Sequence, residues 1–340
     1  MKRITMSMGA GLDGLREETL DRPQPGPGQV LLAVRAVSLN YRELSILVQG
    51  RYPLPVKPNV VAVSDGAGEV IAVGEGVDRL KPGDRVIASI FPQWLDGPFR
   101  LDVIAQLGGS LDGMLSEYVC LPQHALVPIP NHLDWEEAAT LPCAALTAWH
   151  ALTAAGSDLT RQTVLTQGSG GVSLFAIQLA KMQGARVIAT TSQDAKAGRL
   201  RALGADEVIN YRTCQAWGEE SRKLVGGVGV DRVVEVSGAS LAQSLAATRL
   251  GGEIALVGTR GGTSTIDVGA LFGAGVLVRP VAVGSRTQLE AMTQAIGRHR
   301  LKPIIDKVFP FDQAAEAFTY YAAGGGFGKV VIRMPASSSR

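Results

Sequence analysis

Short apolar segments rich in β-branched residues, separated by proline and glycine, make up roughly the first 140 residues. The clearest are residues 28–37 (GQVLLAVRAV), 65–73 (DGAGEVIAV) and 84–90 (DRVIASI). A Pro-Gly pair at residues 82–83 is typical of a turn that leads into a strand. We therefore expect a mainly β region, in which sustained helical periodicity is confined to residues 134–155.

From residue 163 onward the pattern alternates between strands and helices. Residues 163–167 (TVLTQ) form a short apolar strand, and residues 171–183 place apolar side chains at the spacing of one helix face. Further strands are expected at residues 185–191, 207–211, 231–236 and 253–257, with a helix at 194–203. Apolar strands separated by helices indicate a parallel sheet that is covered on both faces. The pattern predicts a doubly wound α/β domain.

Beyond residue 285 the expected order is helix (287–298), strand (near Val308), helix (312–323) and strand (329–333). The simplest arrangement returns this segment to the first region and makes the doubly wound domain an insertion. We predict one domain from residues 1–145 plus 287–340 and a second from residues 146–286.

A glycine-rich turn joins the strand at 163–167 to the helix that follows it. The turn consists of Gly168, Ser169, Gly170, Gly171, Val172 and Ser173. Glycine permits a tight reversal and close approach of a pyrophosphate to backbone N–H groups, and the positive end of the helix attracts phosphate. We interpret the segment as a dinucleotide-binding turn, with Ser173 where glycine or alanine is usual. A turn that only packs the helix on the sheet is the alternative.

The end of the next strand indicates which dinucleotide binds. A site for NAD has an acidic residue there for the ribose 2′-hydroxyl. This sequence instead has Thr190, Thr191 and Ser192, followed by Lys196 and Arg199. Hydroxyls and cations suit a 2′-phosphate, which a carboxylate would repel. We predict NADPH, and ordinary solvated helix charges are the alternative for Lys196 and Arg199.

Composition and charge narrow the class of protein. The 340 residues are 46% hydrophobic, and the 33 Lys and Arg against 31 Asp and Glu leave a charge of +2 without a basic block, so nucleic acid is not an expected partner. The longest apolar stretch, residues 268–278, is about half a membrane span, and the N-terminus lacks the apolar region of a signal peptide. Three scattered cysteines favour a reducing compartment. We expect a cytoplasmic protein without a membrane partner.

Several short motifs follow one another along nearly the whole chain. Besides the glycine turn, they are residues 37–43 (VSLNYRE), 64–73 (SDGAGEVIAV), 81–86 (KPGDRV), 138–149 (AATLPCAALTAW), 203–211 (LGADEVINY) and 327–331 (FGKVV). In these motifs the chain resembles the zinc-independent, quinone-oxidoreductase-like branch of the medium-chain dehydrogenase/reductase superfamily. The resemblance implies a Rossmann domain inserted in a GroES-like, mainly β catalytic domain.

The zinc-dependent members of that superfamily hold a catalytic metal that we do not expect here. Their first cysteine ligand is replaced by Asn40 and their His-Glu pair by Ser64 and Asp65, so that only Cys143 stands at a ligand position. One soft ligand cannot hold a catalytic zinc, which takes three protein ligands, and the four-cysteine loop of a structural zinc is also missing. The prediction is an enzyme without metal.

Without a Lewis acid, an isolated carbonyl must be polarised by hydrogen bonds alone, which is a weaker means. A quinone or an α,β-unsaturated carbonyl is already electrophilic at the carbon that receives hydride, so this class of substrate is expected. The resemblance places Asn40, Tyr41 and Tyr52 near the nicotinamide, with Tyr52 as the first candidate for a proton donor or orienting residue. Packing of Tyr52 beside its neighbouring prolines, with water as the donor, is the alternative.

The resemblance also implies cofactor contacts and an assembly state. The cofactor positions are Thr147, Gly168, Ser169, Gly170, Gly171, Val172, Ser192, Lys196, Tyr211, Ser237, Val257, Gly258, Val283, Phe327 and Lys329. A homodimer is expected through an edge of the nucleotide-binding sheet at residues 274–283. The long loop 91–113 either borders the substrate opening with Trp94, Leu95 and Phe99 or is a packing loop.

Two other functions stay open at this point. One is a zinc-free, NADP-dependent alcohol dehydrogenase or ketone reductase, in which hydroxyl donors replace the metal. The other is an NADPH-binding protein with a structural or sensing role and little turnover.

Overall fold

The structure is a computed structural model that describes residues 1–154, 158–258 and 266–335. The chain divides into two compact units. The first comprises Met1–Leu146 and Val283–Arg340, and the second comprises Thr147–Ala282.

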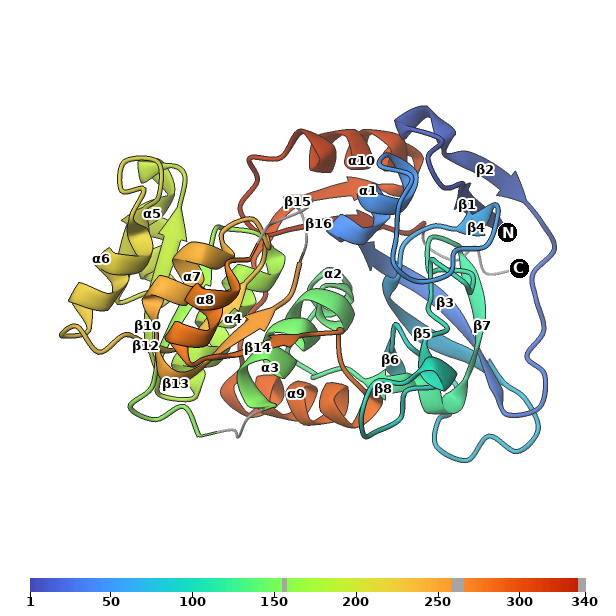
Figure 1. The fold of residues 1–340 in the computed structure, drawn as a ribbon. Coiled ribbons are helices and arrows are strands. Elements are labelled where there is room, and N and C mark those ends of the chain that lie inside the picture. Colours follow the sequence, from blue (N-terminus) through green and yellow to red (C-terminus); the bar gives the residue numbers. More distant parts are fainter. Residues whose placement is uncertain (155–157, 259–265, 336–340) are drawn as a thin grey trace. The chain divides into compact units, whose positions relative to one another are not determined.

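The first unit is built on a seven-stranded sheet in the order β15-β16-β3-β5-β6-β8, with β7 also paired to β3. Its strands are β3 (Gln29–Ser38), β5 (Asp65–Val73), β6 (Arg85–Ala88), β7 (Tyr118–Pro122), β8 (Leu126–Pro128), β15 (Ile305–Pro310) and β16 (Lys329–Arg333). The C-terminal strand β16 runs antiparallel to β3, with Val331 opposite Ser38, so residues from both ends of the chain share this sheet (Figure 1). The buried face of the sheet carries alternating apolar residues such as Val30, Leu32 and Val34.

Smaller elements complete the first unit. A three-stranded sheet has the order β2-β1-β4, from β1 (Lys2–Met6), β2 (Arg16–Thr19) and β4 (Val60–Val61). The α-helices are α1 (Tyr41–Leu47), α2 (Trp135–Ala139), α9 (Arg286–His299) and α10 (Ala314–Ala323). Single turns are η1 (Leu12–Gly14), η2 (Leu101–Val103), η3 (Gln123–Ala125) and η6 (Phe311–Gln313), and η4 (Leu141–Ala145) is π-helical.

Helix α1 corrects the expectation that helical periodicity in this region is confined to residues 134–155. Its seven residues are too few to show a sustained period, and a capping box between Asn40 and Glu43 starts it. The stretch 134–155 itself is divided into α2, η4 and α3 (Leu146–Thr153), with Pro142 at the start of the π-helical turn. Residue 155 lies outside the described residues.

The second unit confirms the predicted doubly wound parallel sheet. Its six strands have the order β11-β10-β9-β12-β13-β14, and every neighbouring pair is parallel. The strands are β9 (Thr163–Gln167), β10 (Arg186–Thr191), β11 (Glu207–Asn210), β12 (Val230–Glu235), β13 (Thr248–Leu256) and β14 (Leu277–Pro280). The helical elements between them are α4 (Gly171–Met182), η5 (Asp194–Lys196), α5 (Ala197–Ala202), α6 (Trp217–Leu224), α7 (Leu241–Ala247) and α8 (Val268–Ala274).

The strand order reverses between β9 and β12, which are neighbours at the centre of this sheet. Ligands of open α/β sheets bind beyond the carboxyl ends of the strands at such a reversal. Across the described residues, no helix has the length and apolar character needed to cross a bilayer.

Candidate active site and cofactor site

The glycine turn lies at the carboxyl end of β9, on one side of the reversal in strand order. Gly168 has φ of +78°, a conformation that favours glycine, and apart from the adjacent residues no described atom lies within 4 Å of a side-chain carbon built at Gly168 or Gly170. Gly170 precedes α4 and gives it no side-chain cap, so the first N–H groups of this 12-residue helix keep their capacity for an anion.

Ser173 explains how the turn works without its usual last glycine or alanine. Its side chain is 2% exposed, and its hydroxyl donates a hydrogen bond to the carbonyl of Gln167. The hydroxyl therefore ties the first turn of α4 back to the end of β9 instead of pointing toward the phosphate position.

Lys196, the cation predicted to follow β10, contacts the glycine turn. Lys196 Nζ donates to Ser169 Oγ at 3.1 Å, so a residue of η5 reaches the loop after β9. Thr191 Oγ1 is bonded locally to Gln193, and Ser192 stays partly exposed. Asp194, an exposed acid two residues beyond Ser192, was not among the predicted residues; its carboxylate accepts a hydrogen bond from the Asn210 amide at 2.8 Å.

Glu235 is a functional candidate that the sequence analysis missed. It ends β12, on the other side of the reversal, and is 0% exposed. One carboxylate oxygen accepts from Ser237 N at 3.1 Å and Gly238 N at 2.9 Å, and the other accepts from Gln167 Nε2 at 2.7 Å and Ser244 Oγ at 2.6 Å. Burial alone would raise the pKa of Glu235, but these donors outweigh it and hold the pKa below its ordinary value. Glu235 thus fixes the loop that contains Ser237.

The remaining predicted cofactor residues are distributed over both units. In the second unit Thr147 is buried, Tyr211 is 40% exposed and Val257 N donates to the carbonyl of Glu235 at 2.8 Å. Gly258 has to be glycine, because a side-chain carbon there would lie 2.2 Å from the carbonyl oxygen of Val236. Val283, Phe327 and Lys329 belong to the first unit.

The second unit fits a dinucleotide with phosphate groups. It combines an uncapped helix N-terminus, two open glycines and a lysine whose ammonium reaches the turn. These residues would hold a pyrophosphate and a further phosphate on the ribose.

In the first unit, Asn40, Tyr41 and Tyr52 lie in and around a buried polar cluster at the start of α1. Glu43, 0% exposed, accepts from Asn40 N at 2.7 Å and from Ser64 N and Oγ at 3.1 and 2.9 Å. The Glu43 carboxylate therefore joins Asn40, which caps α1, to Ser64, which immediately precedes β5.

Arg42 connects this cluster to Tyr52. Its guanidinium donates to the carbonyl of Leu107 at 2.9 Å and, through Nε, to Tyr52 Oη at 3.1 Å, and its carbon lies 5.0 Å from the centre of the Tyr52 ring. Arginine has donors only, so the Tyr52 oxygen accepts and its own proton stays available to another acceptor. The hydroxyl of Tyr41 accepts from Gln49 at 2.6 Å.

Lys329 enters the same cluster from β16. It is 3% exposed, and its ammonium donates to the carbonyl of Leu39 at 2.6 Å and to Asn40 Oδ1, with a carboxylate oxygen of Asp65 3.9 Å away. Asp65 is 0% exposed, and its nearest neutral donors, the Asn40 side chain and the Cys143 backbone, lower its pKa without meeting full hydrogen-bond geometry. Burial raises the pKa of Asp65 to about 7, although Lys329 opposes the rise.

The donor set of this cluster does not fit a catalytic zinc. The Asn40 oxygen is taken by Lys329, the Ser64 hydroxyl donates to Glu43, and the ammonium of Lys329 would repel a second cation beside Asp65. Burial, followed by the Asp65 carboxylate, raises the pKa of the Cys143 thiol far above its ordinary value. Across the described ranges, no three His, Cys, Asp or Glu side chains are grouped to hold a metal.

The aromatic residues of the loop 91–113 pack against one another. Trp94 is 2% exposed, its indole N–H donates to the carbonyl of Gly97 at 2.9 Å, and its ring lies 4.8 Å from that of Phe99. The alternatives for this loop were packing and a border of the substrate opening. Trp94 is buried and packs, whereas Leu95 is 42% exposed.

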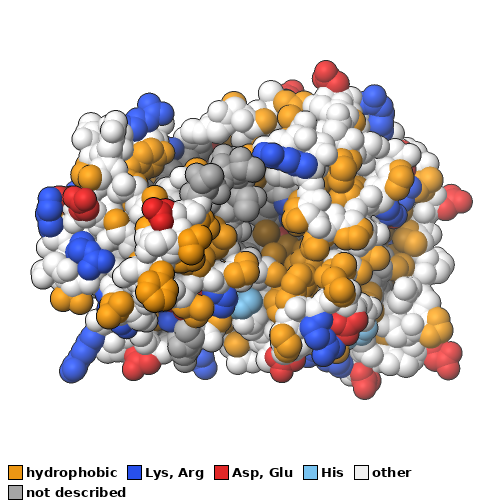
Figure 2. All heavy atoms as spheres, viewed as in Figure 1, with side chains coloured by type: hydrophobic (Ala, Val, Ile, Leu, Met, Phe, Trp, Pro, Cys, Tyr) orange, Lys and Arg blue, Asp and Glu red, His pale blue; other side chains and the backbone are white. Residues whose placement is uncertain are grey.

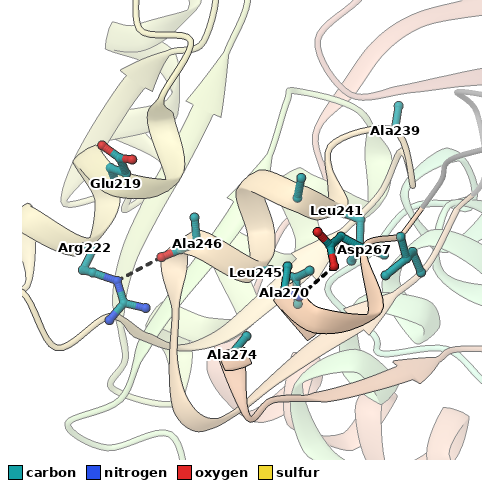
Figure 3. A pocket seen from close by; sticks show the side chains of 11 residues that line it. Glu219, Arg222, Ala239, Leu241, Leu245, Ala246, Asp267, Ala270 and Ala274 are labelled. Atoms are coloured by element: carbon teal, nitrogen blue, oxygen red, sulfur yellow. Dashed lines mark hydrogen bonds between the residues drawn. The ribbon is translucent and has the colours of Figure 1, made fainter. Parts of the chain in front are cut away.

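A pocket of about 500 Å³ lies in the second unit between α6, α7 and α8 (Figure 3). Its lining is mostly alanine and leucine. Two of its charged residues are engaged locally, since Arg222 donates to the carbonyl of Ala246 at 2.9 Å and Asp267 accepts from Ala270 N at 3.1 Å (Figure 3). Because this lining is mostly apolar, we assign the candidate cofactor site of the second unit to the glycine turn, and we treat the polar cluster of the first unit as a separate candidate.

Comparison with known proteins places the chain in a family. Residues 26–131 match the alcohol dehydrogenase GroES-like domain, and residues 171–298 match the zinc-binding dehydrogenase family. A zinc-type alcohol dehydrogenase-like protein of Schizosaccharomyces pombe is 40% identical over 335 residues, covering 96% of both chains. A 2-methylene-furan-3-one reductase of Solanum lycopersicum is 32% identical, covering 93% of this chain and 74% of the relative.

A solved structure has the same fold as this chain. The putative alcohol dehydrogenase of Sinorhizobium meliloti 1021 is 40% identical, with a TM-score of 0.88 and 98% of each chain covered. Sequence and structure therefore agree that this chain, a GroES-like domain combined with a Rossmann-type sheet, belongs to the medium-chain dehydrogenase/reductase superfamily and is an NAD(P)-dependent oxidoreductase.

Proposed function

We propose that this protein is a zinc-independent, NADPH-dependent reductase of quinones or α,β-unsaturated carbonyl compounds. The observation that carries the proposal is the buried cluster of the first unit. There the ammonium of Lys329 donates a hydrogen bond to Asn40 Oδ1 and lies 3.9 Å from Asp65. A site so arranged favours acceptors that need no Lewis acid. The tomato relative supports this class, since the ketone in its name is conjugated to a methylene group.

NADPH is proposed on the contact between Lys196 and Ser169. The ammonium brings a positive charge to the turn next to the hydroxyl-bearing end of β10. Charge-assisted hydrogen bonds of this kind stabilise a 2′-phosphate. The carboxylate of Asp194, the nearby acid, accepts a hydrogen bond from the side-chain amide of Asn210.

The residues of the first unit have defined parts in this proposal. Bound NADPH would supply a hydride from its nicotinamide ring. Tyr52, with its oxygen occupied by Arg42, would donate its hydroxyl proton in a hydrogen bond to the substrate oxygen. Asn40 holds the start of α1 and one side of Lys329, and thereby fixes the cluster.

The test combines binding, metal content and turnover on one purified sample. We expect NADPH to bind roughly tenfold tighter than NADH or better, zinc to be far below one per chain, and an enone to be reduced faster than the matching saturated ketone. Stoichiometric zinc or a preference for NADH would contradict the proposal.

A second candidate is reduction of simple ketones or oxidation of alcohols without zinc. The names of the fission yeast relative and of the Sinorhizobium structure favour it. Faster turnover of the saturated ketone than of the enone in the same assay would support this candidate instead.

We further propose a homodimer that pairs through β14, at the outer end of the six-stranded sheet. Around this edge Val268, Phe272 and Leu277 are 76%, 89% and 56% exposed, and apolar side chains gather over α7 and α8 (Figure 2). An exposed apolar edge strand is a typical interface. We expect a dimer by light scattering and a monomer for Phe272→Glu, with Tyr320→Phe as a control in the other unit. A monomeric wild-type protein would contradict this arrangement.

The compartment is part of the proposal as well. We propose the cytoplasm, supported by three cysteines that are all free thiols.

A further inference from the structure

Tyr52, the proposed donor, lies in a segment outside the helices and strands. The segment runs from the end of α1 to the start of β4, and Tyr52 is half-buried there. Its neighbours Arg51 and Pro53 are both exposed. The ring is thus not fixed by a sheet or a helix, and its orientation depends on side-chain contacts.

The contact that orients Tyr52 comes from Arg42, in the first turn of α1. Arg42 is 8% exposed, and its Nε donates to Tyr52 Oη at 3.1 Å. Nη1 donates to the carbonyl of Leu107 at 2.9 Å and lies 3.4 Å from Glu43 Oε1, and Nη2 donates to Gln106 Oε1 at 3.3 Å. Each nitrogen of this buried, planar guanidinium has a partner, so the direction in which Nε donates is fixed.

Gln106 joins the guanidinium to the segment that carries Tyr52. Gln106 is 0% exposed, and its amide nitrogen donates to the carbonyl of Pro55 at 2.8 Å, three residues beyond Tyr52. Its amide oxygen accepts from Arg42. The reverse orientation of the amide would place donor against donor and acceptor against acceptor, so both contacts require this one. One side chain therefore holds both the arginine and the backbone near the tyrosine.

The backbone beside Gln106 leaves room for the guanidinium. Gly108 has φ of +64°, and a side-chain carbon there would lie 3.3 Å from Arg42 Nη1 and 3.0 Å from the carbonyl carbon of Val63. The left-handed conformation and these short distances both favour glycine. The end of the loop 91–113 therefore packs against Arg42 and encloses it.

We propose that Arg42 is a positioning residue for the reduction and that Gln106 holds it in the orientation this requires. The inference rests on the proposed function, in which the Tyr52 hydroxyl donates a hydrogen bond to the substrate oxygen. Arg42 itself touches neither substrate nor cofactor. By donating to Tyr52 Oη it occupies an acceptor position of that oxygen, so the phenol proton is directed to another acceptor. Its positive charge also stabilises the electron density that the phenol oxygen gains when its proton is shared with the substrate.

Arg42 also compensates the buried charge of Glu43, and the test has to separate this structural effect from an effect through Tyr52. Arg42→Lys keeps a positive charge beside Glu43 but loses the planar set of donors. Gln106→Leu leaves both charges and Tyr52 in place and removes only the amide.

The test is a double-mutant cycle with Tyr52→Phe, in which enone reduction and NADPH binding are measured for each variant. Arg42→Lys is expected to lower kcat about tenfold, the effect of one misdirected hydrogen bond, and to leave the dissociation constant of NADPH unchanged. In the Tyr52→Phe background the same substitution is expected to change kcat less than about twofold, because the oxygen on which Arg42 acts is gone. Gln106→Leu is expected to give a smaller loss that also disappears in this background.

Arg85→Lys is the matched control. Arg85 on β6 also donates to a backbone carbonyl, that of Leu133 at 2.8 Å, and its guanidinium carbon lies 4.4 Å from the centre of the Trp135 ring. It therefore has the same kinds of partner as Arg42, but not Tyr52. We expect Arg85→Lys to leave kcat nearly unchanged in both backgrounds.

The outcomes separate the inference from the function on which it rests. Equal losses from Arg42→Lys with and without the Tyr52 hydroxyl would overturn the inference, because Arg42 would then act on the fold and not through Tyr52. A wild-type kcat in folded Arg42→Lys would overturn it as well, and if this variant does not fold, the cycle with Gln106→Leu decides in the same way. In each of these cases the proposed reductase function stands. Wild-type protein that binds NADPH but reduces no quinone or enone would overturn both.

Discussion

At the scale of single residues, the proposed preference for NADPH depends on Lys196. Its ammonium lies 3.1 Å from Ser169 Oγ in the glycine turn. We expect Lys196→Ala to weaken NADPH binding roughly tenfold to a hundredfold, the value of one charge-assisted hydrogen bond, and to leave NADH binding nearly unchanged. Fluorescence titration with both cofactors measures the two dissociation constants.

The control for this prediction is Lys181→Ala in the same unit. Lys181 pairs with Asp206 at 3.0 Å, and both side chains are partly exposed. Equal losses for NADPH and NADH in Lys196→Ala would mean that the ammonium acts on the shared pyrophosphate and not on the 2′-phosphate.

Tyr52 is the second residue at which loss of one atom, the hydroxyl oxygen, tests the proposed function. Its oxygen is occupied by Arg42 Nε, so only the hydroxyl proton remains to be donated. Tyr52→Phe is expected to lower kcat/KM about 10²-fold without changing the dissociation constant of NADPH, as loss of one oxyanion donor does. Steady-state kinetics with an enone test this, and Tyr320→Phe, whose exposed hydroxyl donates to Asp306, is the matched control.

At the scale of elements, Glu235 joins β9, β12 and α7. It accepts from Gln167 at the end of β9 and from Ser244 in α7, and it also holds the backbone of Ser237 and Gly238. Glu235→Gln introduces an amide N–H₂ that faces donors, so we expect a loss of about 2–3 kcal/mol in the free energy of unfolding. We also expect weaker NADPH binding, because the loop that contains Ser237 loosens.

The pH dependence of this effect has a definite sign. The pKa of Glu235 is lowered in the folded protein, so its contribution to stability is present above the unfolded pKa and is lost as pH falls through the folded pKa. Urea unfolding of wild type and Glu235→Gln at several pH values checks this, with the exposed Glu219→Gln as control. A destabilisation that stays constant down to strongly acidic pH would rule out the carboxylate as its source.

At the scale of the whole molecule, Asp65 makes stability depend on pH in the opposite sense. Its folded pKa of about 7 lies above the ordinary 3.8, so its contribution is fully present below about pH 4 and is lost as pH rises through about 7. Asp65→Asn carries no charge at any pH. The difference in melting temperature between the variant and wild type is therefore expected to shift in favour of the variant from pH 4 to pH 8, and a constant difference would contradict the raised pKa.

The local part of the candidate cofactor site could be predicted from the sequence. The strand Thr163–Gln167, the glycine turn and helix α4 depend on residues that follow one another, and the predicted strand has the observed bounds. Hydrophobic periodicity and glycine conformation are both short-range properties, so a local pattern is sufficient for them. The doubly wound sheet follows from the repetition of this pattern.

The polar cluster could be predicted only in part from the sequence. The sequence shows that Asn40, Ser64 and Asp65 stand where zinc-dependent relatives have ligands, but it does not show what replaces the metal. Lys329 stays a predicted cofactor contact, and the sequence did not show that its ammonium lies 2.6 Å from the carbonyl of Leu39, 290 positions away in the chain. Helix α1 escaped the periodicity analysis because seven residues are shorter than two full repeats of its pattern.

The sequence by itself thus determined the alternating domain and the glycine turn between β9 and α4, because each depends on neighbouring residues. The tertiary structure alone decided that Lys329 lies beside Asp65, that Arg42 occupies the Tyr52 oxygen and that Glu235 holds the Ser237 loop. These contacts bring together residues from different elements, and burial sets the protonation of Asp65 there. Hydrogen bonding and burial between distant segments exist only once the chain has folded, and they are the physical basis of the chemistry proposed for this site.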